Sequence, residues 1–163
     1  MLSLSDPIEM LRPPVLRFGL DTTRSLAGWI SDQGFRRPVV IADPVNAARL
    51  GVLGLGDPSC FGTVLPDPDI ANLMAAVAAA EGADCVIGFG GGSAMDLAKM
   101  VAVMAGHDLT LAEISGPNRA PARRVGLVQI PTTAGTGSEV GTRALITDPA
   151  TQAKVATESR HML

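Results

Sequence analysis

The sequence is poor in the residues on which many extracellular, nucleic-acid-binding and membrane-spanning proteins depend. Its two cysteines, Cys60 and Cys85, form neither a CxxC redox motif nor a zinc-ligand pattern. There is no tyrosine and only 3% of the residues are aromatic, so base-stacking platforms for nucleic acid are not expected. No apolar run reaches the roughly 20 residues of a membrane-spanning helix. Segment 1–14 lacks the basic start and apolar core of a secretory signal.

The charge balance points the same way. Thirteen Lys and Arg residues against sixteen Asp and Glu residues give a formal net charge of −3. A mildly acidic chain argues against nucleic acid or an anionic membrane as the main partner. The simplest location is therefore cytoplasmic. The 163 residues are 47% hydrophobic and 18% charged, which predicts one folded domain over 1–163.

Short apolar runs alternate along the chain with segments of helical periodicity. This alternation predicts an α/β fold in which a Rossmann-like parallel sheet has helices on both faces and a β-hairpin follows at the C-terminal end. The expected strands are 14–19, 38–43, 60–65, 84–89 and 125–130, with a hairpin of 143–147 and 153–157. The expected helices are 22–33, 45–50, a segment between Asp69 and Gly82, and 94–105, whereas 106–124 reads as an irregular crossover.

Three polar segments fall at the carboxyl ends of expected strands. They are Asp43, the run Gly90–Ser93 and the loop Thr132–Glu139. Ligands of parallel sheets bind beyond these strand ends. Because the three segments are distant in sequence, their convergence at one edge is the best evidence from the residues for a binding site.

The run Gly90–Ser93 joins a strand to a helix. Three successive glycines let the backbone approach a phosphate closely, and the helix N-terminus adds partial positive charge. The alternative is a tight turn followed by a helix cap; three glycines at this place favour phosphate binding. The dinucleotide fingerprint GxGxxG and the nucleotide-hydrolase ending GK(S/T) are both absent.

Asp43 and a hydroxyl-rich loop are the other polar candidates. A carboxylate at the end of strand 38–43 can accept hydrogen bonds from ribose hydroxyls, but Asp before Pro44 is equally common as a turn residue. Four hydroxyl residues on a glycine-containing loop suit contacts to a sugar or pyrophosphate, or alternatively cap backbone groups in a turn. These four are Thr132, Thr133, Thr136 and Ser138.

The remaining polar residues favour structural roles. His107 and His161 have no partner at metal-ligand spacing, so surface or capping roles are expected. The cluster of Arg119, Arg123 and Arg124 is expected to be solvated. Cys85 lies within an apolar run and is expected to be a core residue.

Two long motifs resemble those of the iron-containing (group III) alcohol dehydrogenase family. They are GGGSAMDLAK at 90–99 and PTTAGTGSE at 131–139. The step 66–68 and the hairpin 146–154 also follow the family pattern. The resemblance implies an NAD-binding N-terminal α/β domain, and an acid at Asp43 favours NAD over NADP.

The resemblance also implies a set of cofactor-binding residues. Gly91, Gly92 and Ser93 hold the pyrophosphate, with Asp96 in the same helix turn. Lys154 reaches the nicotinamide ribose, and Asp67 stands where the family often has Asn on the adenosine side. The full implied set is Asp43, Asp67, Gly91, Gly92, Ser93, Asp96, Thr132, Thr133, Thr136, Ser138 and Lys154.

In the family, a helical second domain supplies one Asp and three His that bind iron or another divalent metal. None of these positions is expected in this chain, so no catalytic or metal-binding residue is assigned, and His161 is not taken as a ligand. We therefore expect the NAD-binding half of a metal-dependent alcohol dehydrogenase, inactive alone, whose whole enzyme acts on a small alcohol or aldehyde. A homo-oligomer is compatible with this prediction. The alternative is a stand-alone, non-catalytic nucleotide-binding module.

Overall fold

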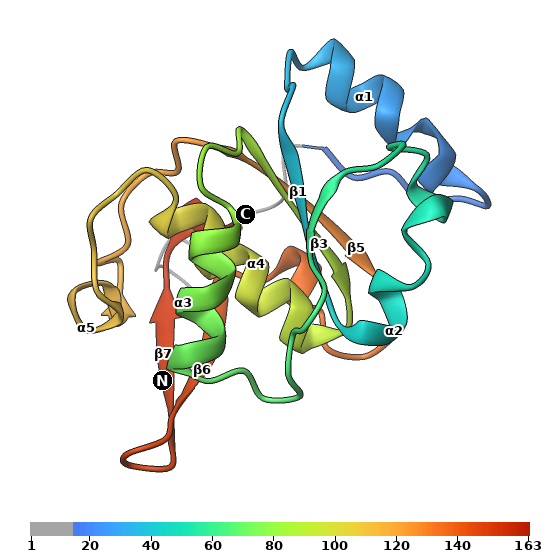
Figure 1. The fold of residues 1–163 in the computed structure, drawn as a ribbon. Coiled ribbons are helices and arrows are strands. Elements are labelled where there is room, and N and C mark those ends of the chain that lie inside the picture. Colours follow the sequence, from blue (N-terminus) through green and yellow to red (C-terminus); the bar gives the residue numbers. More distant parts are fainter. Residues whose placement is uncertain (1–14) are drawn as a thin grey trace, which may run out of the picture.

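The computed structural model describes residues 15–163, which form two sheets on either side of a long helix, α4 (Figure 1). The segment 1–14, for which the sequence predicts no secretory signal, lies outside the described residues. The larger sheet is entirely parallel and has the order β2-β1-β3-β5. Its strands are β1 (Pro38–Ala42), β2 (Ser59–Phe61), β3 (Cys85–Gly90) and β5 (Gly126–Pro131). The predicted α/β class and parallel sheet are thereby confirmed.

Helices cover both faces of this sheet, as predicted. On one face α3 and α4 pack side by side, and on the other lie α1 and the short segments α2 and η2. The helical segments are η1 (Thr22–Ser25), α1 (Leu26–Asp32), α2 (Pro44–Ala47), η2 (Leu50–Leu53), α3 (Ile70–Ala79), α4 (Gly92–Met104), α5 (Leu111–Ile114), η3 (Ser138–Val140) and η4 (Arg160–Met162).

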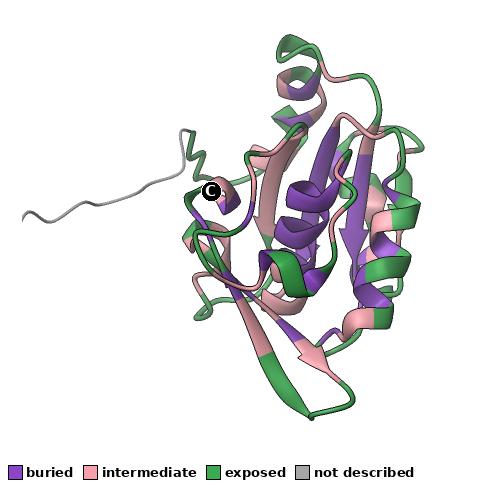
Figure 2. Ribbon diagram, turned by 90° about the vertical axis from the view of Figure 1, so that its left-hand side faces the viewer, coloured by how far each residue is buried: buried purple, intermediate pink, exposed green. Residues whose placement is uncertain are grey.

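The central strands are apolar on both sides because each face meets a helix layer. Along β1, Val39 and Ile41 join the core under α3 and α4, whereas Val40 and Ala42 join the core under α1. Figure 2 shows that buried residues concentrate in these strands and in α4. Gly88 in β3 permits this packing, because a Cβ there would lie 2.9 Å from the Cβ of Ala98 on α4.

The predicted C-terminal hairpin forms and gains a third strand. β6 (Arg143–Asp148) and β7 (Ala153–Glu158) pair in antiparallel fashion, and β4 (Gly116–Pro117) adds to β7 from within the predicted crossover. The hairpin packs on α4 through Ala144 and Ile146, both buried. Helix α4 is therefore covered on both sides, while the hairpin tip is exposed (Figure 2).

One expected strand is wrong. Residues 15–18 have no regular secondary structure, and Pro14 lies outside the described residues. A strand needs a neighbour for its backbone N–H and C=O groups, and neither edge strand, β2 nor β5, pairs with this segment. Its apolar residues are instead exposed, with Leu16 at 73% and Phe18 at 98%.

Two helix boundaries also differ from the sequence prediction. Helix α4 begins at Gly92 rather than Ala94, because Gly91 is extended and the chain turns directly into the helix. Helix α2 ends at Ala47 rather than at residue 50, and a separate 3-10 turn, η2, follows. The glycine run thus supplies the first residues of the helix itself.

Candidate functional site

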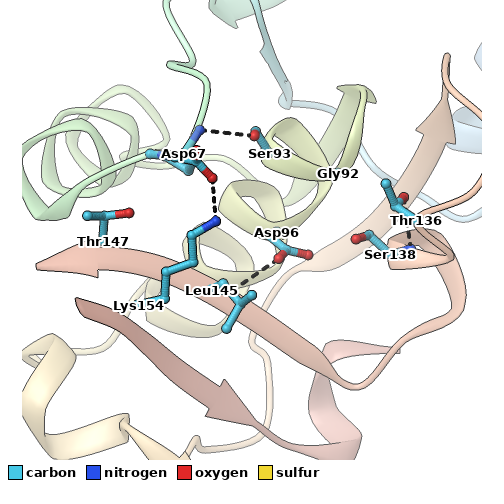
Figure 3. Close-up of a pocket in the computed structure, with 10 residues that line it drawn as sticks. Asp67, Gly92, Ser93, Asp96, Thr136, Ser138, Leu145, Thr147 and Lys154 are labelled. Carbon is cyan, nitrogen blue, oxygen red and sulfur yellow. Dashed lines mark hydrogen bonds and ion pairs between the residues drawn. The ribbon is translucent and has the colours of Figure 1, made fainter. Parts of the chain in front are cut away.

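A pocket of about 230 Å³ opens where the N-terminus of α4, the loop after β5, the turn before α3 and the hairpin meet (Figure 3). It is smaller than the roughly 300–1,000 Å³ of typical small-molecule sites, so it can hold only part of a dinucleotide. Its lining residues are Asp67, Pro68, Gly92, Ser93, Asp96, Thr136, Ser138, Leu145, Thr147 and Lys154.

The N-terminus of α4 is suited to an anion. Met95 is the first residue whose N–H bonds back within the helix, to the Gly91 carbonyl, so the amides before it have no acceptor in the helix. No side chain caps this end, whereas Asp43, Asp69 and Thr110 cap α2, α3 and α5. The longest helix therefore presents free amides and its positive dipole end to the pocket.

The hydroxyl-rich loop closes over the glycines. A Cβ on Gly92 would lie 3.2 Å from Cγ2 of Thr136, and a Cβ on Gly91 would lie 3.3 Å from Oγ1 of Thr133. Thr136 and Ser138 line the pocket opposite the helix end (Figure 3). A Cβ at either position would be in tight contact with the loop as it stands.

Asp67 and Lys154 face each other across the pocket. Lys154 Nζ lies 2.5 Å from Asp67 Oδ1, and both side chains are more than half exposed. The backbone N–H of Asp67 donates to Ser93 Oγ at 3.3 Å (Figure 3). Asp67 has a left-handed backbone with φ of 53°, which Asp and Asn adopt more readily than most residues.

Asp96 lies in the pocket wall with both carboxylate oxygens engaged. Oδ1 accepts from Lys99 Nζ at 3.1 Å, and Oδ2 accepts from the Leu145 backbone N–H at 3.1 Å. Lys99, almost entirely buried, also donates to the Arg143 carbonyl at 2.6 Å. Burial lowers the pKa of Lys99, and the adjacent Asp96 carboxylate opposes that shift. These contacts fasten β6 to α4.

Asp43 belongs to a second polar group beside the glycines. Its Oδ1 accepts the Val45 and Asn46 amides and its Oδ2 accepts Asn46 Nδ2 at 2.6 Å. Partial burial opposes ionisation, but these hydrogen bonds outweigh it and lower the pKa of Asp43. Asn46 Nδ2 also lies 3.4 Å from Thr132 Oγ1, which links this group to the loop after β5.

The structure thus brings the predicted residues together as two adjoining groups. The pocket holds Asp67, Gly92, Ser93, Asp96, Thr136, Ser138 and Lys154. Beside it lie Asp43, Gly91, Thr132 and Thr133: the carboxylate Oδ2 of Asp43 is 2.9 Å from a Cβ placed on Gly90, and Thr132 N–H donates to the Gly90 carbonyl at 2.9 Å.

Sequence reasoning missed Asn46, Lys99 and Thr147. Asn46 lies three residues after Asp43, a spacing at which a side chain can contact a helix cap residue. Lys99 lies three residues after Asp96, the spacing of an ion pair on one helix face. Thr147 lines the pocket because alternate residues of β6 face it together with Leu145.

The residues expected to be structural have the following places. His107 Nε2 lies 3.2 Å from the Ala122 carbonyl and Ser159 Oγ accepts the His161 amide. Burial, with Asp84 nearby, raises the pKa of Cys85 to about 12, which confirms an inert core thiol. The expectation for Arg123 is wrong: this residue is half-buried, its pKa is lowered by burial, and its Nη2 donates to the Leu163 carbonyl at 2.6 Å.

Residues 15–163 offer no metal site: no three His, Cys, Asp or Glu side chains among them lie close enough to hold a metal ion. The same residues contain no helix with the length and apolar character needed to cross a membrane. A second hollow, of about 500 Å³, lies at the other end of the hairpin beside Thr142, Glu158 and His161. None of the predicted site residues lines it.

The family model of the iron-containing alcohol dehydrogenases matches residues 13–163. The chain belongs to this family. Among its relatives, long-chain-alcohol dehydrogenase 1 from Geobacillus thermodenitrificans is 34% identical over 145 residues, which cover 78% of this chain and 36% of the relative. Alcohol dehydrogenase 4 from Saccharomyces cerevisiae is 28% identical over 155 residues, covering 88% of this chain and 40% of the relative. The chain thus spans about two fifths of these relatives and matches the N-terminal part of the family.

Solved structures of family members have the same fold. An alcohol dehydrogenase from Oenococcus oeni matches with a TM-score of 0.87 at 27% identity, over 96% of this chain and 44% of the other. A sulfoacetaldehyde reductase from Bifidobacterium kashiwanohense, solved in complex with NAD+, matches with a TM-score of 0.83 at 23% identity, over 98% of this chain and 45% of the other. The likeness places the parallel sheet, α4 and the hairpin in the family's N-terminal architecture.

Proposed function

We propose that this chain is the NAD-binding part of an alcohol dehydrogenase whose whole protein transfers a hydride between a small alcohol or aldehyde and NAD. The observation that carries the proposal is the uncapped N-terminus of α4, formed by Gly91, Gly92 and Ser93 and facing Thr136 across the pocket. The nicotinamide ring supplies the hydride chemistry when bound. This chain contributes binding and orientation.

Each group has a defined part in that binding. The free amides of the first turn of α4 donate to the pyrophosphate, and the Ser93 hydroxyl adds a further donor. Thr136 and Ser138 contact the opposite side of the bound group. Lys154 provides positive charge from the hairpin, where the family resemblance implies that it reaches the nicotinamide ribose. The pocket takes this central portion of the dinucleotide, and the remainder extends along the edge of the sheet toward Asp43.

Asp43 sets the preference for NAD. Its carboxylate is charged at neutral pH, since its hydrogen bonds lower a pKa that is ordinarily 3.8, and a charged carboxylate repels the 2′-phosphate of NADP. Asn46 holds that carboxylate in place. The metal of the family has no ligand set among residues 15–163, so we assign no metal-dependent step to this chain.

The test is the affinity of the chain for NAD, measured by calorimetric titration, in a matched pair of glycine variants. Gly92→Ala places a methyl group 3.2 Å from Cγ2 of Thr136, between the helix end and the loop, and we expect NAD affinity to fall. Gly28→Ala, on an exposed turn of α1 with nothing within 4 Å of the added Cβ, should leave NAD affinity unchanged. Equal NAD binding by both variants would refute the phosphate site.

A second experiment tests cofactor choice. The unmodified chain should bind NAD more tightly than NADP. Asp43→Asn retains a good helix cap but removes the charge, so we expect the ratio of the two affinities to move toward one. Equal affinity of the unmodified chain for both cofactors would contradict the role of Asp43.

A further inference from the structure

The only cation that lines the pocket among the described residues is already paired. Lys154 is the sole Lys or Arg in the lining, and its Nζ is 2.5 Å from Asp67 Oδ1. Figure 3 shows Lys154 reaching from the hairpin toward Asp67, across the opening between the hairpin and the first turn of α4. An anionic ligand that enters here meets a lysine whose charge is already balanced by the Asp67 carboxylate.

Asp67 is held in this position from its backbone as well as its side chain. Its N–H donates to Ser93 Oγ, which fixes the turn against the first turn of α4. Its left-handed φ of 53° directs the carboxylate from that turn toward the hairpin. The carboxylate therefore links the phosphate-binding helix end to β7, the strand that carries Lys154.

We propose that Asp67 sets the affinity of this pocket for the dinucleotide by competing with the ligand for Lys154. The inference rests on the proposed function. Both side chains are exposed by more than half, so their pairing is weak enough to exchange when a phosphate or ribose arrives. Asp67 is thus a residue that keeps affinity low.

Asn tests this directly, since Asn tolerates the same left-handed backbone and removes only the charge. In Asp67→Asn we expect the affinity for NAD to increase about two- to fivefold, the range set by an exposed ion pair. Binding should also fall more steeply with added salt, because an unpaired lysine in the pocket then attracts the negative charge of the ligand. The matched control is Asp32→Asn, which makes the same charge change at an exposed site on α1; its affinity should equal that of the unmodified chain.

A second background separates release of Lys154 from simple removal of a negative charge. In Lys154→Met, the further change Asp67→Asn should raise affinity much less than it does in the unmodified chain, because no lysine remains to be released. A gain that persists in full in the Lys154→Met background overturns the competition. The competition is also overturned if Asp67→Asn binds NAD as tightly as the unmodified chain or more weakly, since the Asp67 carboxylate would then itself contact the ligand.

Inorganic pyrophosphate serves as a second probe and distinguishes this inference from the proposed function. One outcome is that pyrophosphate binds, with higher affinity in Asp67→Asn than in the unmodified chain, while NAD binds to no variant. The pocket is then an anion site regulated by Asp67, and the proposed dinucleotide function is wrong. If NAD binds to the unmodified chain but the affinity for neither probe increases in Asp67→Asn, the function stands and the inference fails. Absence of binding of both probes in every variant refutes both.

Discussion

Two aspartate–lysine pairs border the same pocket and differ chiefly in burial. Asp96 and Lys99 lie 3.1 Å apart with side chains 15% and 1% exposed, whereas Asp67 and Lys154 lie 2.5 Å apart with side chains 68% and 52% exposed. The charges and the contact are alike, but the surroundings are not. A buried charge that loses its partner is left without water, and an exposed one is solvated at once. The inner pair is therefore structural, and the outer pair is free to exchange with a ligand.

The inner pair has additional partners that the outer pair lacks. Lys99 donates to the Arg143 carbonyl and Asp96 accepts the Leu145 amide, so the two side chains hold the first residues of β6 against α4. That attachment positions the hairpin, and Lys154 with it, relative to the helix end at Gly92. The inner pair thus fixes the hairpin from which Lys154 reaches Asp67.

The largest effect is expected from breaking the inner pair. Lys99→Met keeps a long buried side chain but leaves the Asp96 carboxylate and the Arg143 carbonyl without their donor. We expect the free energy of unfolding to fall by about 3–5 kcal/mol, measured by urea denaturation. Asp96→Asn combined with Lys99→Met should lose clearly less than the sum of the two single variants, since the partners share one network. Additive losses would show that the buried contact is not an interaction unit.

The two pairs differ in how far the sequence alone predicts them. Asp67 and Lys154 were each implied by family resemblance, but their contact depends on the hairpin folding back over the turn before α3, which no local pattern specifies. The spacing of Asp96 and Lys99 allows an ion pair on one helix face. Their burial follows from the packing of β6 on α4, and the sequence of the helix alone does not predict that a strand packs over this lysine.

The sheet and the convergence of the polar loops were predictable for a physical reason. Parallel strands end at the same edge, so the residues after β3 and β5 had to meet once the strands were identified. The failure at 14–19 has the opposite cause: its β-like composition says nothing about a pairing neighbour, and none of the described strands pairs with residues 15–18. The contact of Asn46 with Asp43 is local, but its contact with Thr132 joins residues 86 positions apart and follows only from the fold.

A pH titration of stability sharpens the comparison with a smaller effect. Burial lowers the pKa of Lys99 below its ordinary value of 10.5. Between the lowered folded-state pKa and 10.5, the unfolded chain binds more protons than the folded chain, so this lysine makes stability rise with pH. The slope is at most about 1.4 kcal/mol per pH unit. The cysteine thiols act in the opposite direction above pH 9, since burial raises their pKa values.

The difference in unfolding free energy between the unmodified chain and Lys99→Met isolates the contribution of the lysine, because both proteins contain the same thiols. We expect the stability lost in Lys99→Met, measured by urea denaturation, to increase as the pH rises toward 10.5, the ordinary pKa of lysine. Lys154→Met, compared in the same way, serves as the exposed-lysine control. A loss in Lys99→Met that stays constant or shrinks over this range would contradict a lowered pKa at Lys99.

The smallest effect is expected from breaking the outer pair. Lys154→Met removes an ion pair whose two side chains are more than half exposed, and water solvates Asp67 as soon as its partner is gone. The free energy of unfolding should therefore change by less than about 1 kcal/mol, and the change should shrink further in high salt. Urea denaturation at low and high ionic strength measures both quantities. A loss as large as that in Lys99→Met, unaffected by salt, would mean that the outer pair also fastens the hairpin to the body of the protein, and Asp67 could then not release Lys154 to a ligand without loosening the fold.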